Sequence, residues 1–192
     1  MMENFISIYA EQTPNPETLK FVANKDLAKG GTFDFTSKEE AERSPLAKAL
    51  FEFEFVKGVF ISANFVTITK PEEWKWIQII PKMRTFLKEF IESGNEVVTA
   101  QMLQEIPSFS HDEGDSEIVR KIKDILGNNI RPVVEMDGGA IDFKSYDEGI
   151  VTLSLRGSCS GCPSSMVTLK GGIEGLLKRL LPEVKEVVAE AL

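Results

Sequence analysis

The chain has 192 residues, of which 42% are hydrophobic and 9% aromatic, with a formal net charge of -8, one histidine and two cysteines. The length suits one domain or two small ones, and the acidic balance argues against nucleic acid as a partner. No apolar run approaches the roughly 20 residues of a membrane-spanning helix, so no membrane is expected, and two cysteines are too few for a disulfide-rich secreted scaffold.

Residues 1–92 predict a small α/β domain with a largely antiparallel sheet. Strands are expected at residues 5–9, 18–22 and 33–35, followed by a hairpin over residues 58–70. Ser44 and Pro45 suit the N-cap and first position of a helix. A longer helix is expected over residues 74–91, with this candidate core: Trp74, Ile77, Ile80, Phe86, Leu87, Phe90 and Ile91. The domain contains neither Cys nor His, so no catalytic group is expected in it.

Residues 93–115 differ from both flanks in charge. They contain five acidic residues and no Lys or Arg, together with Gly and Pro. This composition indicates an acidic linker, with a short ordered stretch around residues 97–106. The only histidine, His111, lies here and is expected to be solvated.

Residues 116–192 predict a second small domain with the order helix, strand, strand, helix, strand. Ser116 is a suitable N-cap for the first helix, which we expect to end at residues 127–129. Residues 130–134 should be extended, and two strands should flank the hairpin turn at residues 147–149. The second helix follows the cysteine segment, and a last strand is expected from residue 184 to 189.

The two cysteines, Cys159 and Cys162, form a C-x-x-C pair in a Gly- and Ser-rich loop. Two thiolates at this spacing can point at one centre. Pro163 suits the first position of a helix, which makes Cys162 its expected N-cap. The positive end of the helix dipole should favour thiolate over thiol, and Arg156 is the nearest basic residue in sequence.

Three interpretations of this pair remain open from the residues alone. The cysteines could be reduced packing residues without chemistry, or the dithiol of a thiol–disulfide oxidoreductase. They could also ligate a metal or an iron–sulfur cluster. A tetrahedral zinc site or a [4Fe–4S] cluster needs four protein ligands, and the chain offers two thiols. Two chains that each give one C-x-x-C would complete the set, so the cysteine count predicts a metal-bridged homodimer.

Two glycine pairs bear on this site. Gly171 and Gly172 lie inside the predicted second helix, where they favour close packing on the sheet or the approach of a second chain. The Asp-Gly-Gly sequence at residues 137–139 predicts a tight turn, whose acidic residue could also line a surface near the cysteines.

Several segments together resemble Nfu-type iron–sulfur proteins. Residues 137–139, 150–155 and 168–170, with Gly-Ser-Cys-Ser-Gly-Cys-Pro-Ser-Ser at residues 157–165, resemble the NifU-like C-terminal domain of that family. Residues 12–21, 44–47 and 64–70 are similar to its N-terminal domain. The resemblance makes residues 1–92 an Nfu N-terminal-like domain and residues 116–192 a NifU-like domain.

The resemblance implies a cluster scaffold or carrier rather than an enzyme. Cys159 and Cys162 match the family's ligand positions and would bind a [4Fe–4S] cluster between two subunits. The implied partners are a second copy of the chain, apo iron–sulfur client proteins and the upstream cluster assembly machinery. Mitochondrial members carry a presequence, whereas this chain begins almost directly at the first domain, so a bacterial cytoplasmic location is expected rather than an organellar matrix.

Overall fold

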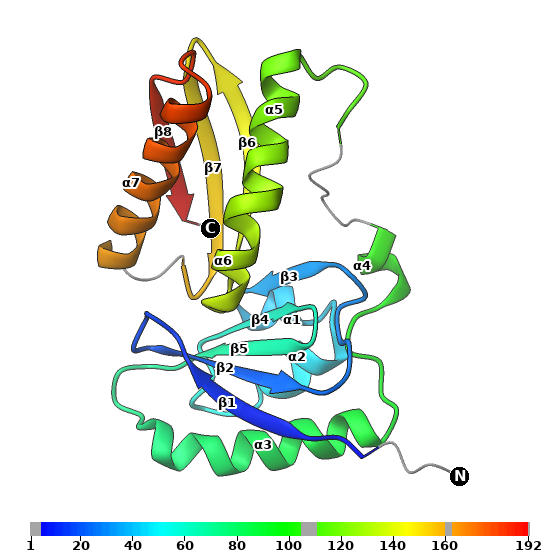
Figure 1. Cartoon of the computed structure of the whole chain (residues 1–192). Helices are drawn as coiled ribbons and strands as arrows, with labels where there is room; N and C mark the ends of the chain where they lie inside the picture. Colours follow the sequence, from blue (N-terminus) through cyan, green and yellow to red (C-terminus); the bar gives the residue numbers. More distant parts are fainter. Residues whose placement is uncertain (1–4, 105–110, 160–162, 192) are drawn as a thin grey trace. The chain divides into compact units, whose positions relative to one another are not determined.

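The protein consists of two compact units, Met1–Ile106 and Pro107–Leu192, each with its own hydrophobic core. The structure is a computed structural model that describes residues 5–104, 111–159 and 163–191. Each unit combines helices with a sheet, which confirms the predicted fold class of two small α+β domains (Figure 1). Within the described residues, no helix has the length and apolarity to cross a membrane.

The first unit is built on a five-stranded antiparallel sheet in the order β1-β2-β5-β4-β3. The predicted hairpin is β4–β5, which turns at Ala63 with a φ of 43°. The strands are β1 (Ile8–Gln12), β2 (Thr18–Ala23), β3 (Thr32–Phe35), β4 (Gly58–Ser62) and β5 (Phe65–Thr69). The helices are α1 (Lys38–Ala41), α2 (Pro45–Leu50), α3 (Trp76–Glu92) and α4 (Ala100–Gln104).

Helix α3 packs against the sheet through a stripe that the sequence pattern identified only in part. The buried residues are Ile79, Met83, Leu87 and Ile91, at a spacing of four along the helix. Ile77, which we expected in the core, is 79% exposed, so that assignment is wrong. The helix carries more apolar residues than one face can bury, and the sequence alone does not say which of them face outward.

The first half of the predicted acidic linker packs against the first unit. Val98 and Met102 are almost completely buried in its core. Ser44, the N-cap of α2 as predicted, accepts a hydrogen bond from the backbone N–H of Ala47 and donates its hydroxyl hydrogen to the carbonyl oxygen of Val97, at an O–O distance of 2.7 Å. These contacts join residues 97–104 to the first unit.

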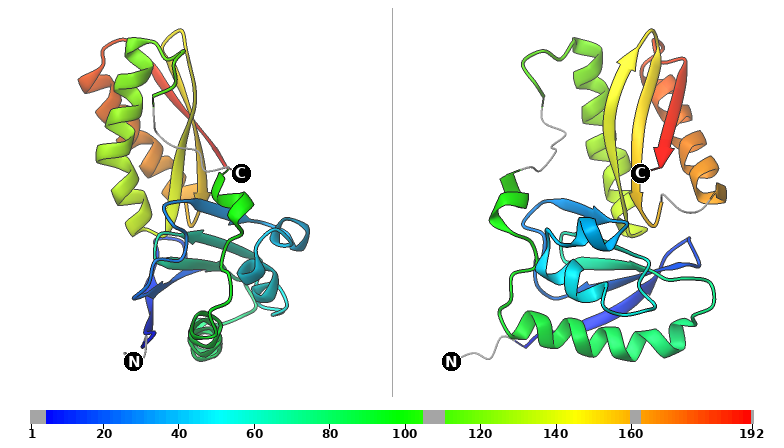
Figure 2. Two further views of the ribbon diagram at one scale, coloured as in Figure 1. Left: turned by 90° about the vertical axis from the view of Figure 1, so that its right-hand side faces the viewer. Right: turned by 180° about the vertical axis from the view of Figure 1, so that it is seen from behind.

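The second unit is a three-stranded sheet with helices on one face (Figure 2). Strands β6 and β7 form an antiparallel hairpin, and β8 pairs in parallel with β7 after the crossover helix α7. The order helix, strand, strand, helix, strand is therefore confirmed. The elements are α5 (Glu117–Ile125), η1 (Leu126–Ile130), α6 (Arg131–Met136), β6 (Gly139–Asp147), β7 (Ile150–Gly157), α7 (Pro163–Leu180) and β8 (Glu186–Ala191).

The first helix of this unit does not end at residues 127–129, and residues 130–134 are not extended. The chain passes through one π-helical turn, in which the Arg131 N–H donates to the Leu126 carbonyl, and continues as α6. Pro132 lies in the first turn of α6, a position in which proline is tolerated. Leu126 and Val134 are both buried, and this burial outweighs the local helix-ending tendency of Gly and Asn.

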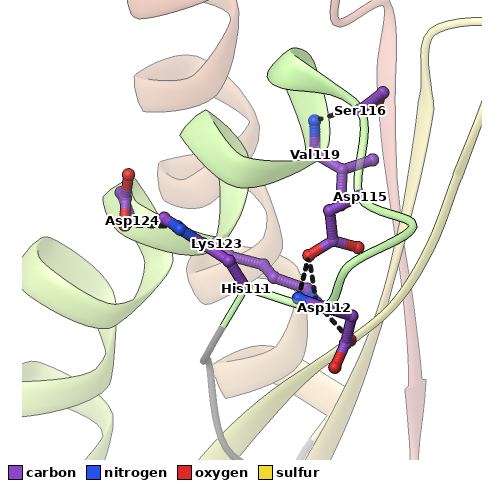
Figure 3. A network of polar contacts seen from close by, with 7 residues as sticks. All are labelled: His111, Asp112, Asp115, Ser116, Val119, Lys123 and Asp124. Carbon is purple, nitrogen blue, oxygen red and sulfur yellow. Dashed lines mark hydrogen bonds and ion pairs between the residues drawn. The ribbon is translucent and has the colours of Figure 1, made fainter.

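The second half of the predicted linker is tied to α5 through a buried lysine. The Lys123 ammonium lies 2.8 Å from a carboxylate oxygen of Asp112 and 2.7 Å from one of Asp115, and its side chain is only 7% exposed (Figure 3). His111 is exposed, and its Nε2 lies 3.0 Å from a carboxylate oxygen of Asp124. Asp112 and Asp115 of the predicted linker therefore form ion pairs with a lysine of the second unit.

The same network makes the stability of the second unit depend on pH. The hydrogen bond from Lys123, aided by the Asp112 backbone N–H, holds the pKa of Asp115 below its ordinary value of about 3.9. Asp115 therefore stabilises the fold above about pH 4, and this contribution is lost as the pH falls through its lowered pKa.

We expect Asp115→Asn to reduce the acid-induced fall in the melting temperature of the second unit, measured by calorimetry from pH 6 downward. Asp147→Asn is the matched control, because it makes the same isosteric change on an exposed turn of the hairpin. Equal acid sensitivity of wild type and Asp115→Asn would contradict this assignment.

Candidate metal centre

The cysteine segment lies at the carboxyl end of β7, the central strand of the second sheet. Gly157, the last residue of β7, pairs in register with Gly139, the first residue of β6. Helix α7 begins at Pro163, in agreement with the predicted helix start. The topology thus places the cysteine segment between a strand end and a helix start, beside the beginning of β6.

The Asp-Gly-Gly turn at residues 137–139 contacts this segment directly. The Ser158 hydroxyl donates a hydrogen bond to the carbonyl oxygen of Asp137, and the Ser158 N–H donates to the carbonyl oxygen of Gly138 at 3.3 Å. Gly138 has a φ of 80°, a conformation that glycine adopts without steric cost. The predicted turn is therefore hydrogen-bonded to Ser158, the residue before Cys159.

Gly139 lies against the thiol of Cys159. A Cβ atom at position 139 would be 2.7 Å from the Cys159 sulfur and 2.7 Å from the backbone oxygen of Arg156. Both distances are far below a normal van der Waals contact, so only glycine fits here without movement of the backbone. Nothing in the sequence alone distinguishes Gly139 from Gly138 in the Asp-Gly-Gly turn.

Cys159 is a buried thiol, only 6% exposed and part of the core of the second unit. Burial raises the pKa of this thiol and is the largest effect; the Ser158 hydrogen bond opposes it, and the negative charge of Asp137 adds a smaller increase. The expected stabilisation of a thiolate therefore does not apply to Cys159. Arg156 does not provide it, because its guanidinium is paired with Asp142 at 2.5 Å.

Cys162, the second predicted ligand and expected helix N-cap, lies outside the described residues. Within the part of the chain that the structure describes, no three side chains of His, Cys, Asp or Glu gather closely enough to hold a metal ion.

The glycines of α7 do not pack on the sheet. Gly171 and Gly172 are exposed, and a Cβ atom at either position would meet no atom within 4 Å. Close helix–sheet packing is thus the wrong explanation for them. Gly175 is equally open, and it lies on the same outward side of the helix as Gly171 and Gly172.

Comparison with known proteins identifies both units. A family model described as "Scaffold protein Nfu/NifU N terminal" matches residues 8–94, and one described as "NifU-like domain" matches residues 122–188. Among solved structures, a NifU-like protein from Saccharomyces cerevisiae aligns with 52% of this chain and 90% of its own, with 23% identity and a TM-score of 0.46. That similarity is too low to support a functional comparison.

Curated relatives match along almost the whole chain. A protein of Drosophila sechellia named "NFU1 iron-sulfur cluster scaffold homolog, mitochondrial" is 45% identical over 94% of this chain and 63% of its own length. The human protein of that name is 42% identical over 95% of this chain and 71% of its own length. The chain thus spans somewhat less than two thirds of the fly relatives.

These names also correct one expectation. The relatives are named as mitochondrial proteins, which points to an organellar matrix, so the prediction of a bacterial cytoplasmic location is wrong. That prediction rested on where the chain begins, which is a poor guide to compartment. The two family models and the identity to the human relative show that the chain belongs to the Nfu family of iron–sulfur cluster scaffold proteins.

Proposed function

We propose that this chain carries a [4Fe–4S] cluster between two subunits and transfers it to apo-proteins. In this proposal Cys159 and Cys162 of each chain supply four thiolates, the number that such a cluster requires. The observation that supports the proposal is the position of Cys159. It directly follows Ser158, which two hydrogen bonds join to the turn at residues 137–139, and Cys162 is the only other thiol of the chain.

The buried position of Cys159 suits a carrier that must also release its cargo. A recipient thiolate takes the place of a Cys159 thiolate on the cluster, and the freed sulfur takes up a proton. No electron is transferred in this exchange. Because burial raises the pKa of the Cys159 thiol, the buried position favours the thiol over the thiolate once the cluster has left.

The proposed partners follow from this exchange. A second copy of the chain completes the ligand set, upstream assembly proteins supply the cluster and apo iron–sulfur proteins receive it. The relatives are named as scaffold proteins, which supports a role without catalytic turnover.

The test is anaerobic reconstitution of the full chain with ferrous iron and sulfide. Wild type should turn brown and develop broad visible absorption, and Cys159→Ser and Cys162→Ser should each abolish it. His111→Ala is the matched control and should keep the absorption, because His111 is the chain's single imidazole and lies beside Asp124. Colour in both serine variants would overturn the ligand assignment.

The same preparations test the other use of a C-x-x-C pair. A thiol–disulfide oxidoreductase would reduce insulin without metal and would cycle a disulfide between its two cysteines. We expect no insulin reduction above the rate of the Cys159→Ser variant. A metal-free wild type with such activity and no cluster after reconstitution would favour the oxidoreductase.

A further inference from the structure

The first unit has apolar side chains that are exposed and lie outside its hydrophobic core. Phe5 is 69% exposed, and Ile77 of α3 is 79% exposed. Pro81 is also exposed and lies one helical turn after Ile77, on the same side of α3. Helix α3 therefore has an outward apolar side in addition to the side that packs on the sheet.

Two hollows lie between helix α3 and the residues of strand β1 and its flanking segments. Strand β1 is an edge strand of its sheet. The first, of about 380 Å³, lies between residues 5–8 and the α3 residues Pro81, Arg84, Thr85 and Lys88. The second, of about 470 Å³, lies between the β1–β2 turn and the side chains of Trp76 and Ile80. The indole N–H of Trp76 donates to the Pro16 carbonyl at 3.0 Å and so fixes one wall of the second hollow.

The charge that lines the first hollow is opposite to that of the whole chain. Arg84 and Lys88 line it, and no acidic side chain of the described residues lines either hollow, although the chain has a net charge of -8. The Arg84 Nε–H donates to the backbone carbonyl of Ile8 at 2.9 Å, which holds the guanidinium at the edge of the sheet. Among the described residues, no carboxylate lies within ion-pair distance of Arg84, and Lys88 has only Glu92, at 3.8 Å.

We propose that this face of the first unit binds an acidic, apolar segment of a partner polypeptide. Apolar side chains of the segment enter the two hollows, and its carboxylates pair with Arg84 and Lys88. Charge complementarity selects such a partner, because Arg84 has no carboxylate within ion-pair distance in the described part of the chain and Lys88 has one, Glu92, at 3.8 Å. Strand β1 is the edge of its sheet, so an extended segment can pair with it as a further strand, which a lipid surface cannot do.

The identity of the partner, as a donor or recipient of the cluster, rests on the proposed function. The docking surface itself does not, since all its residues belong to the first unit and none is a cysteine. A test with the metal-free chain therefore separates the two proposals. Loss of docking would leave the cluster chemistry intact, and a failed reconstitution would leave docking intact.

The experiment is selection of a random 12-residue peptide display library on the metal-free full chain. We expect enrichment of peptides that combine large apolar residues with Asp or Glu. Synthetic copies of the enriched peptides should bind Arg84→Glu/Lys88→Glu at least about tenfold more weakly, the effect of replacing two attractive charge contacts with repulsive ones. Ile77→Asp should weaken them as well.

The matched control is Lys38→Glu/Lys82→Glu, which makes the same change in net charge at residues that line neither hollow. It should bind the peptides as wild type does. Equal binding to all variants, or enrichment of basic peptides, would overturn the proposal. So would charge-dependent sedimentation of wild type with phosphatidylglycerol vesicles in the absence of peptide enrichment, which would assign the face to an anionic membrane surface.

Discussion

Gly139→Ala is expected to destabilise the second unit by about 3 kcal/mol and to expose the Cys159 thiol. The added methyl group would lie 2.7 Å from both the Cys159 sulfur and the Arg156 carbonyl oxygen. The sulfur can rotate away, but the carbonyl belongs to β7 and is held by its register with β6. Strand pairing at the base of the cysteine segment must therefore shift.

Two measurements on the metal-free chain check this expectation. Calorimetry should show a lower melting temperature for the second unit, and Cys159 should react faster with a thiol reagent in a Cys162→Ser background. Gly172→Ala is the matched control: position 172 is open and helical, so the same substitution should stabilise the unit by up to about 1 kcal/mol. Equal effects of the two substitutions would contradict the packing described for Gly139.

Leu153→Ala is expected to destabilise the second unit and to leave the stability of the first one unchanged. Leu153 is completely buried in β7, which pairs with strands on both sides. Removal of a buried leucine costs about 2–5 kcal/mol, which is a large part of the roughly 5–15 kcal/mol that stabilises a small domain. The two units have separate cores, so the loss should not spread.

Tryptophan fluorescence separates the two outcomes, because Trp74 and Trp76 both belong to the first unit. In urea, Leu153→Ala should leave the fluorescence transition unchanged while far-ultraviolet circular dichroism shows early loss of structure. Ile61→Ala, at a fully buried position of β4, is the converse control and should move the fluorescence transition. A fluorescence shift of similar size in both variants would show that the units unfold together.

The alternation of apolar residues in strands and the residue types at helix starts predicted the fold well wherever the local sequence pattern agrees with the burial seen in the structure. The β4–β5 hairpin, the cap at Ser44 and the start of α7 at Pro163 lie where the residue types place them. Residues 127–134 failed because a Gly-Asn-Asn sequence followed by Pro normally ends a helix. Here the π turn accommodates the proline while Leu126 and Val134 remain in the core, so tertiary packing overrides the local signal.

Charge was the other feature that sequence alone misjudged. The acidic run before residue 116 suggested a solvated tether, but Asp112 and Asp115 pair with Lys123, whose ammonium is almost inaccessible. A lysine of α5 that requires two carboxylates cannot be recognised from its position in a helical pattern. The pairing across 8 and 11 residues becomes visible only when the chain folds back.

The candidate site was predicted in its residues but not in its arrangement. The spacing of Cys159 and Cys162 identified the ligands proposed here, and the Asp-Gly-Gly turn was noted separately. Only the β6–β7 register brings the two together, through Ser158 and Gly139. A contact between residues about 20 positions apart depends on strand pairing, which a local sequence pattern does not predict.

The most direct test of the cluster proposal is the stoichiometry and mass of the anaerobically reconstituted protein. The account predicts about four irons and four sulfides per two chains. Native mass spectrometry should find them in a dimer that dissociates when the cluster is removed. A loaded monomer, a dimer with about half a zinc per chain and no sulfide, or an iron-free chain would contradict it.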